Sequence, residues 1–296
     1  MKMKKSKIKK SKSDIIMDIV VYSFLLLFAL ICLYPVWYVV AASFADGTEL
    51  AKHSGIFLWP QKFLLGAYKM VFSNRLFMNG FFNSIKILLV ALPVNIVMTL
   101  LCGYFLSCTG MLFKKPVAYL IMFTMFFSGG LIPRYLNMKD LGLINNFWVL
   151  VLPTALNVYN AIICKTAIEA IPESLKESAY IDGANDIKII FKIIVPLLKP
   201  TLAVLLLYYG VAHWNSWFPA SIYIKDNIKL PVQNILRDIL LENTELSGAG
   251  SGDEYNMYAE TIRYVAIVVS TLPVMCIYPF LQKYFAKGAM IGAVKG

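Results

Sequence analysis

Charged residues are scarce in this chain of 296 residues: they make up 15% of it, whereas hydrophobic residues make up 59%. Soluble domains are about a quarter charged and about half apolar. The mean hydropathy of +0.66 points the same way, so we expect much of the chain to lie in a lipid bilayer. Histidine is rarer still, and the two histidines, His53 and His213, are far apart in sequence. A metal site therefore has few ligands to draw on.

Sequence motifs of membrane enzymes and pumps are also missing. The chain has no G-x-x-x-x-G-K-[ST] phosphate loop, no G-x-S-x-G elbow and no H-E-x-x-H, which argues against an ATPase or a hydrolase. The centres of its apolar runs hold no Asp, Glu, Lys or Arg, whereas ion-coupled carriers and cation channels need such groups. We expect a protein that catalyses no reaction and binds no cofactor itself. A secondary carrier, a membrane enzyme, a passive channel and a structural subunit are the weaker alternatives.

Cysteine is present but lacks the spacing of metal or redox motifs. All five cysteines fall in or beside apolar runs, so we interpret them as small buried hydrophobic residues: Cys32, Cys102, Cys108, Cys164 and Cys276.

Six apolar runs are long enough to cross the bilayer, which takes about 17 to 25 residues each. Each is predicted to be helical, because backbone groups in lipid must bond within the protein. The fold class is therefore an all-α integral membrane protein with a basic N-terminus at 1–18, a transmembrane domain at 19–285 and a tail at 286–296. The runs are Ile19–Ser43, Ser84–Cys108, Val117–Tyr135, Phe147–Cys164, Thr201–Ile224 and Tyr264–Tyr284.

Basic residues before the first run set the predicted orientation. That run is near 25 residues long, whereas the apolar part of a cleaved signal peptide has about 7 to 15, so we expect a retained anchor. With the first segment in the cytoplasm, the inside segments carry more Lys and Arg than the outside loops. We therefore expect a protein of the bacterial plasma membrane with both termini on the cytoplasmic side. The net charge of +11 then reflects topology and contact with anionic lipid, not nucleic acid. The basic residues are Lys2, Lys4, Lys5, Lys7, Lys9, Lys10 and Lys12.

The polar segment between the fourth and fifth runs, residues 171–196, predicts two short helices joined by a turn. Pro172 suits the first position of a helix and Glu173 its N-terminus. Gly183 suits a left-handed C-terminal cap, and Asn185 or Asp186 can cap the next helix.

The same segment carries a spaced pattern: Glu177-Ser178-Ala179, three residues, Gly183, nine residues, then Ile193-x-Val195-Pro196. It resembles the E-A-A-x3-G-x9-I-x-L-P loop of ABC importer permeases, from which Ser178 and Val195 depart conservatively. The strings at 181–184 and 292–296 are similar to those of carbohydrate-uptake permeases, and those at 127–133 and 278–285 to their polysaccharide and oligosaccharide branch.

This resemblance implies a transport subunit for oligosaccharides or glycan fragments, with a non-sugar polar solute as the alternative. The loop would dock on a cytoplasmic ATPase that holds the ATP and Mg. The implied partners are a second homologous permease, a pair of ATPase subunits, an extracellular solute-binding protein and membrane lipid. The implied coupling positions are Glu177, Ser178, Ala179, Asp182, Gly183 and Ala184.

Polar and aromatic residues in the fourth and fifth runs are candidates for the solute pathway, because amides bond hydroxyls and aromatic faces stack on sugar rings. The alternatives are interfacial anchors for Trp and Tyr and interhelical contacts for Asn. Gly129-Gly130 with Pro133 predicts a kink or a close helix contact rather than a ligand site. Loops 46–83 and 225–260 could receive a solute-binding protein or be plain connectors. The pathway candidates are Asn157, Tyr159, Asn160, His213, Trp214, Asn215 and Trp217.

Overall fold

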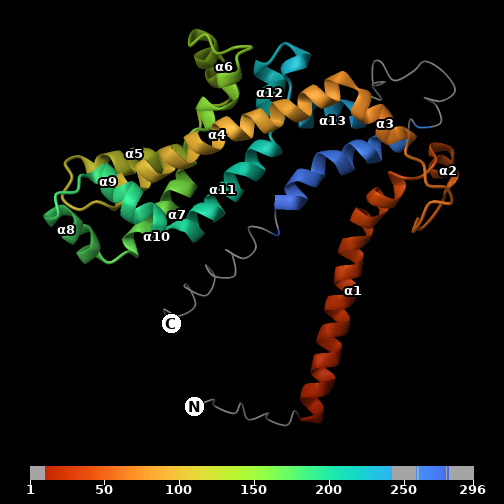
Figure 1. Cartoon of the computed structure of the whole chain (residues 1–296), viewed down its shortest axis with the longest axis horizontal. Helices are drawn as coiled ribbons and strands as arrows, with labels where there is room; N and C mark the ends of the chain where they lie inside the picture. The colour runs from red at the N-terminus through yellow and green to blue at the C-terminus, as the bar shows by residue number, and fades with distance from the viewer. Residues whose placement is uncertain (1–10, 242–257, 259, 278, 280–296) are drawn as a thin grey trace. The chain divides into compact units, whose positions relative to one another are not determined.

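The computed structural model describes residues 11–241, 258, 260–277 and 279, and this part of the chain is helical with no strand (Figure 1). The all-α fold class is confirmed to that extent. The predicted basic residues before 11, residues 242–257 and 259 of the loop 225–260, the end of the last apolar run at 280–284 and the tail at 286–296 lie outside the described residues. The helices are α1 (Lys12–Ala42), α2 (Gly47–Lys52), α3 (Gly66–Ser73), α4 (Arg75–Ser107), α5 (Lys114–Phe126), α6 (Leu131–Asp140), η1 (Phe147–Leu150), η2 (Leu152–Thr154), α7 (Val158–Glu169), α8 (Glu173–Ile181), α9 (Asp186–Ile189), η3 (Ile190–Ile194), α10 (Val195–Leu197), α11 (Lys199–Trp214), α12 (Phe218–Tyr223), η4 (Asn227–Lys229), α13 (Val232–Leu241) and a last helix, Glu260–Ile277.

The chain divides into two compact units, of which unit 1 comprises residues 1–71 and 250–268. Its described core gathers around the end of α1, where Ala45 and Phe57 are buried. The Tyr38 ring meets the rings of Phe57 and Tyr264 edge-on, with centroids 6.0 and 5.7 Å away. Thr261 donates its hydroxyl to the Ala45 carbonyl at 3.0 Å. These contacts tie the last helix to the segment after α1.

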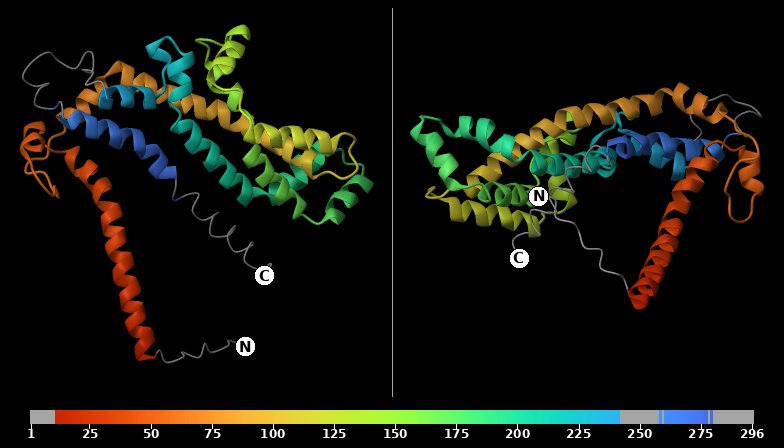
Figure 2. Two further views of the ribbon diagram at one scale, coloured as in Figure 1. Left: turned by 180° about the vertical axis from the view of Figure 1, so that it is seen from behind. Right: turned by 60° about the horizontal axis from the view of Figure 1, so that its bottom comes forward.

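Unit 2, residues 72–249 and 269–296, is built around α4, which runs along α7 and α11 (Figures 1 and 2). The buried face of α4 carries small residues at helical spacing, among them Gly80, Ala91 and Gly103. A Cβ atom on Gly103 would lie 3.0 Å from the Cβ of Cys164 on α7. Small residues let helix backbones approach closely, which is how helices pack in membranes without a hydrophobic driving force.

Long apolar helices match the predicted membrane spans only in part. Three helices are individually long and apolar enough to cross a membrane: α1, α4 and Glu260–Ile277. Three bent pairs pass the same test if each pair is one span: α5 with α6, 147–154 with α7, and 186–197 with α11. The described chain therefore has three candidate spans, or up to six.

The third, fourth and fifth apolar runs are interrupted helices rather than the continuous ones we predicted. Gly130 has φ +86° and breaks the third run, so that α5 and α6 meet at 118°. This confirms a kink at the Gly129-Gly130 pair. No atom lies within 4 Å of a Cβ built on Gly130, so a close helix contact there is not observed. Proline at the start of η2 and α12 marks the other two interruptions.

Helix boundaries follow local capping chemistry. The Asn74 side chain accepts the backbone N–H of Phe77 at 2.8 Å. This cap places the beginning of α4 well before Ser84, where the predicted apolar run begins.

The cysteines fit their prediction less well. Cys164 is buried, whereas Cys32 and Cys276 are exposed on helix faces that no described part of this chain covers.

Candidate functional site

The predicted elbow at 171–196 is present as α8 followed by a turn and α9. Gly183 has φ +76°, and its N–H donates to the Tyr180 carbonyl at 3.0 Å while the Ala184 N–H donates to the Ala179 carbonyl at 2.9 Å. This pair of bonds closes the C-terminus of α8 and requires a left-handed residue. Asn185 caps α9 by accepting the Lys188 N–H at 2.9 Å. The predicted capping roles of Gly183 and Asn185 are confirmed.

Pro172 lies one position earlier than predicted, at the cap of α8 and not in its first turn. The three residues Glu177-Ser178-Ala179 of α8 lie in two environments. Ala179 is buried against its own unit with Ile168, Ile189 and Ile194, whereas Glu177 and Ser178 are exposed. The small side chain of Ala179 therefore serves internal packing of the elbow.

An exposed surface remains on α8 and its turn, made up of Leu175, Glu177, Ser178, Ile181, Asp182 and Gly183, and we call it the elbow surface. Ile181 is 86% exposed and Leu175 is 45% exposed. Two large apolar side chains on an otherwise polar, short helix leave apolar area that a partner can bury.

Two tyrosines and one carboxylate join this elbow to α4. The Tyr104 hydroxyl donates to Asp186 Oδ1 at 2.6 Å, the Tyr180 hydroxyl donates to the same oxygen, and the two hydroxyls lie 3.0 Å apart. The hydrogen bonds from Tyr104 and Tyr180 lower the pKa of Asp186, which precedes the spanning helix α11. The carboxylate beside it raises the pKa of Tyr180. We call these three residues the tyrosine lock.

We expect Tyr104→Phe to lower the free energy of unfolding by about 1 kcal/mol at neutral pH, because one charge-assisted hydrogen bond is lost. A carboxyl whose folded pKa is lowered stabilises the fold above its unfolded pKa of about 3.9 and loses that effect as pH falls through the folded value. The difference between wild type and variant should therefore shrink below about pH 4. Thermal unfolding of the purified protein in detergent from pH 2 to 7.5 measures it. A difference that is constant across this range would contradict the lock.

A cavity of about 420 Å³ lies within unit 2 between α6, η2, α11 and α12, and we call it the first cavity. Its apolar wall includes Ile87 and Leu150. Its polar lining is Arg134, Thr154, Asn157, Tyr209, His213, Ser216 and Tyr223. Cavities of about 300 to 1,000 Å³ with a few convergent polar groups are typical of ligand sites.

Polar residues of α4 hold the wall of the first cavity. The Asn95 amide donates to the carbonyls of Thr154 and Ala155 at 2.6 and 3.1 Å, so its oxygen faces His213 Nε2 at 2.9 Å. That oxygen can only accept, so His213 carries its proton on Nε2. Thr99 bonds the Tyr209 hydroxyl at 2.7 Å. Asn95, Thr99 and Tyr209 were not among the residues predicted for the site, although an Asn and a Thr inside an apolar run are signals that could have indicated the first two.

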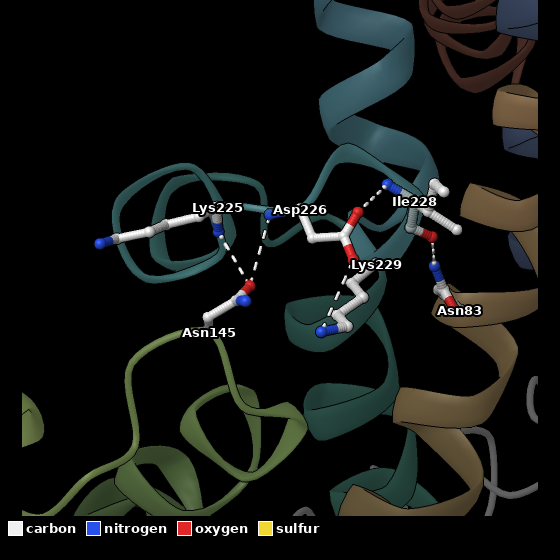
Figure 3. A network of polar contacts seen from close by, with 6 residues as sticks. All are labelled: Asn83, Asn145, Lys225, Asp226, Ile228 and Lys229. Carbon is white, nitrogen blue, oxygen red and sulfur yellow. Dashed lines mark hydrogen bonds and ion pairs between the residues drawn. The ribbon is translucent and has the colours of Figure 1, made fainter.

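A second cavity of about 430 Å³ adjoins the first and shares Ile87 and Leu150 with it. Figure 3 shows the contacts on its rim, where the Asn145 oxygen accepts the backbone N–H groups of Lys225 and Asp226 at 3.1 and 3.3 Å. From α4, the Asn83 amide donates to the Ile228 carbonyl at 2.7 Å. The polar lining is Asn83, Lys86, Asn145, Asn146 and Lys229.

The predicted pathway residues fall in three places. Asn157 and His213 line the first cavity, and Asn157 also lines an open groove of about 620 Å³ together with Tyr159 and Asn160. Asn157 also caps α7 by accepting the Asn160 N–H at 3.1 Å. The structure therefore brings these four residues to one region of unit 2.

Trp214, Asn215 and Trp217 line none of these three hollows. Trp214 is buried and donates its indole N–H to the Ser270 carbonyl at 2.9 Å. The Trp217 ring lies 4.6 Å from the Arg237 guanidinium, and Asn215 caps the end of α11. Among the described residues, no group of three or more His, Cys, Asp or Glu side chains could hold a metal ion.

Comparison with known proteins identifies the chain over most of its length. Residues 64–291 match the family described as "Binding-protein-dependent transport system inner membrane component". The chain is 42% identical to the polygalacturonan/rhamnogalacturonan transport system permease protein YtcP of Bacillus subtilis, covering 94% of this chain and 98% of the relative. It is 40% identical to protein LplC of the same organism, covering 90% of each. A crystal structure of a bacterial ABC transporter that imports the acidic polysaccharide alginate superposes with a TM-score of 0.86 at 31% identity, over 94% of this chain and 100% of that chain.

Proposed function

Since the chain belongs to the family of binding-protein-dependent transport system inner membrane components, we propose that the elbow surface is where a separate cytoplasmic ATPase drives it. The chain is the permease of an ABC importer for oligosaccharides or polysaccharides, a non-catalytic multi-pass subunit of the inner membrane. Members of this family typically bind no cofactor. ATP and Mg would be held by the ATPase partner.

The observation that carries the proposal is the exposed apolar area of the elbow, above all Ile181 at 86% exposure beside Glu177. A single exposed isoleucine does not by itself indicate a docking surface, but Ile181 lies next to a turn whose conformation Gly183 fixes. The tyrosine lock and the burial of Ala179 hold the helix against its unit. A rigid, partly apolar surface suits docking better than a mobile one, because less conformational entropy is lost.

We propose six spans, in which the first two bent pairs each cross the membrane once and α11 is the spanning part of the third pair. Both termini and the elbow at 171–196 would lie in the cytoplasm. The excess of Lys and Arg in the segments assigned to the inside supports this orientation. Tyr159 and Tyr208 line the open groove of unit 2, and a second, homologous permease would cover it. An extracellular solute-binding protein would deliver the cargo, as the family description indicates.

We propose that the cargo is a glycan with carboxylate groups, because one relative is named for polygalacturonan and rhamnogalacturonan and another structure is that of an alginate importer. The first cavity, with Asn157 and His213, and the groove, with Tyr159 and Asn160, would belong to its pathway. Trp214, Asn215 and Trp217 would act by packing, capping and holding α13.

Co-purification tests the elbow surface. We expect Glu177→Ala with Ile181→Ser to reduce recovery of the ATPase at least tenfold from mild detergent, since burying an isoleucine contributes about 1.5 to 3 kcal/mol and 1.4 kcal/mol is tenfold in affinity. Recovery of the second permease should not change. Glu173→Ala is the matched control, because it removes an exposed acid from the same helix outside the elbow surface.

Equal recovery of the ATPase by wild type and the double variant would refute docking through the elbow surface. Loss of both partners at once would mean that the variant is misfolded, and a rescue by Glu177→Gln with Ile181→Leu separates that case. A chain that transports solute with no other subunit would instead be a carrier.

A further inference from the structure

The two adjoining cavities of unit 2 carry positive charge, and no acidic side chain is among the described residues that line them. Arg134 lines the first cavity, and Lys86 and Lys229 line the second. Cavities with one sign of charge and apolar walls concentrate ions of the opposite sign. We call the two cavities together the basic vestibule.

Two of these three cations lack an acidic partner in the described part of the chain. Lys229 lies 3.6 Å from Asp226. The Lys86 ammonium instead lies 5.0 Å over the Phe147 ring, and Arg134 makes no ion pair with any described residue. When an arginine lines a cavity and has no carboxylate partner, the N–H donors of its planar guanidinium group are available to a ligand.

Neutral polar groups beside Arg134 are available in the same way. The Asn157 oxygen is used in capping α7, but its amide N–H groups have no acceptor among the described residues. The Ser216 hydroxyl likewise has no partner in the described part of the chain, where Ser216 bonds through its backbone N–H. The rim is held in place by Asn83 and Asn145, which bond the loop that carries Lys229 (Figure 3). The vestibule therefore offers fixed cations beside donors suited to hydroxyl groups.

From this geometry we propose that the basic vestibule binds carboxylate groups of the glycan, with Arg134 and Lys86 each pairing with a carboxylate of a uronate unit. The inference rests on the proposed function for the identity of the cargo and adds a binding site in this chain. A neutral sugar would leave both cations unpaired, so the vestibule selects for acidic glycans.

Two measurements on the purified importer complex test it, and the first needs no ATP coupling. Trigalacturonate and its methyl ester are titrated onto the complex with wild-type chain, Arg134→Gln or Lys86→Gln. We expect wild type to bind the acid at least tenfold more tightly than the ester and each variant to lose most of that preference. The preference should also weaken with added salt. Lys139→Gln is the control, since it removes a positive charge from α6 outside the cavity linings.

The second measurement is ATP-driven uptake of the same two glycans in liposomes. We expect Arg134→Gln to lower uptake of the acid several-fold and uptake of the ester by a smaller factor, so that the ratio of acid uptake to ester uptake falls. Wild-type binding without preference, or variants that weaken acid and ester equally, would overturn the vestibule assignment. Failure of the proposed function can be distinguished from failure of the vestibule assignment. A complex that lacks the ATPase or does not hydrolyse ATP would show no uptake, but its preference for the acid over the ester in binding could still be measured.

Discussion

Replacing Gly183 with valine is expected to reduce ATP-driven uptake at least tenfold. Gly183 has φ +76°, a conformation that strains a β-branched residue by about 1 to 3 kcal/mol. Relief of that strain would open the two hydrogen bonds that close α8 and displace the elbow surface. Uptake of glycan into liposomes, together with recovery of the ATPase, measures the effect.

Gly183→Asn is the matched control, because asparagine adopts left-handed conformations more readily than other residues with a side chain. No atom lies within 4 Å of a Cβ on Gly183, so added bulk alone should be tolerated, and we expect this variant to keep most of the activity. If valine and asparagine were equally active, the left-handed turn would have no role in transport.

Replacing Gly103 with valine is expected to destabilise unit 2 by about 3 kcal/mol or more, since overpacking a close contact costs typically 1 to 3 kcal/mol and here involves backbone. A Cβ atom would lie 3.0 Å from both the Cβ and Sγ of Cys164 and 3.1 Å from the backbone nitrogen of Lys165. The helix α7 would have to move away from α4. The thermal midpoint of the chain in detergent and its yield measure this effect.

Gly210→Ala serves as the control, because no atom lies within 4 Å of the added Cβ on α11. Adding Cys164→Gly to the Gly103→Val variant should restore part of the stability, since it removes two of the three close atoms but not the Lys165 backbone. Wild-type stability in Gly103→Val would show that α4 and α7 do not pack this closely.

Local chemistry explains what the sequence could predict. Gly183 and Asn185 determine the turn after α8 through backbone conformation and a single cap, which depend on neighbouring residues alone. The break at Gly130 is of the same kind. Apolar runs identify membrane segments for a similar reason, since each residue contributes its own transfer free energy.

Contacts between residues far apart in sequence could not be predicted in this way. Tyr104 and Asp186 are 82 positions apart, and Asn95 and His213 are 118 apart. Their pairing depends on the register of α4 against its neighbours, which no local pattern encodes. For Ala179, the sequence indicates a small side chain but not whether the close neighbour belongs to this chain or to a partner.

The joint between α10 and α11 has a mechanical consequence. The segment Asp186–Leu197 meets α11 at 88°, and Leu198 at the corner is buried. At 1.5 Å per residue the two arms are roughly 18 and 24 Å long. A rigid rotation of both arms about Leu198 would convert a displacement of the Asp186 end into a perpendicular displacement at the far end of α11. That second displacement would be larger by about one third, and it would fall on the helix that carries Tyr209 and His213.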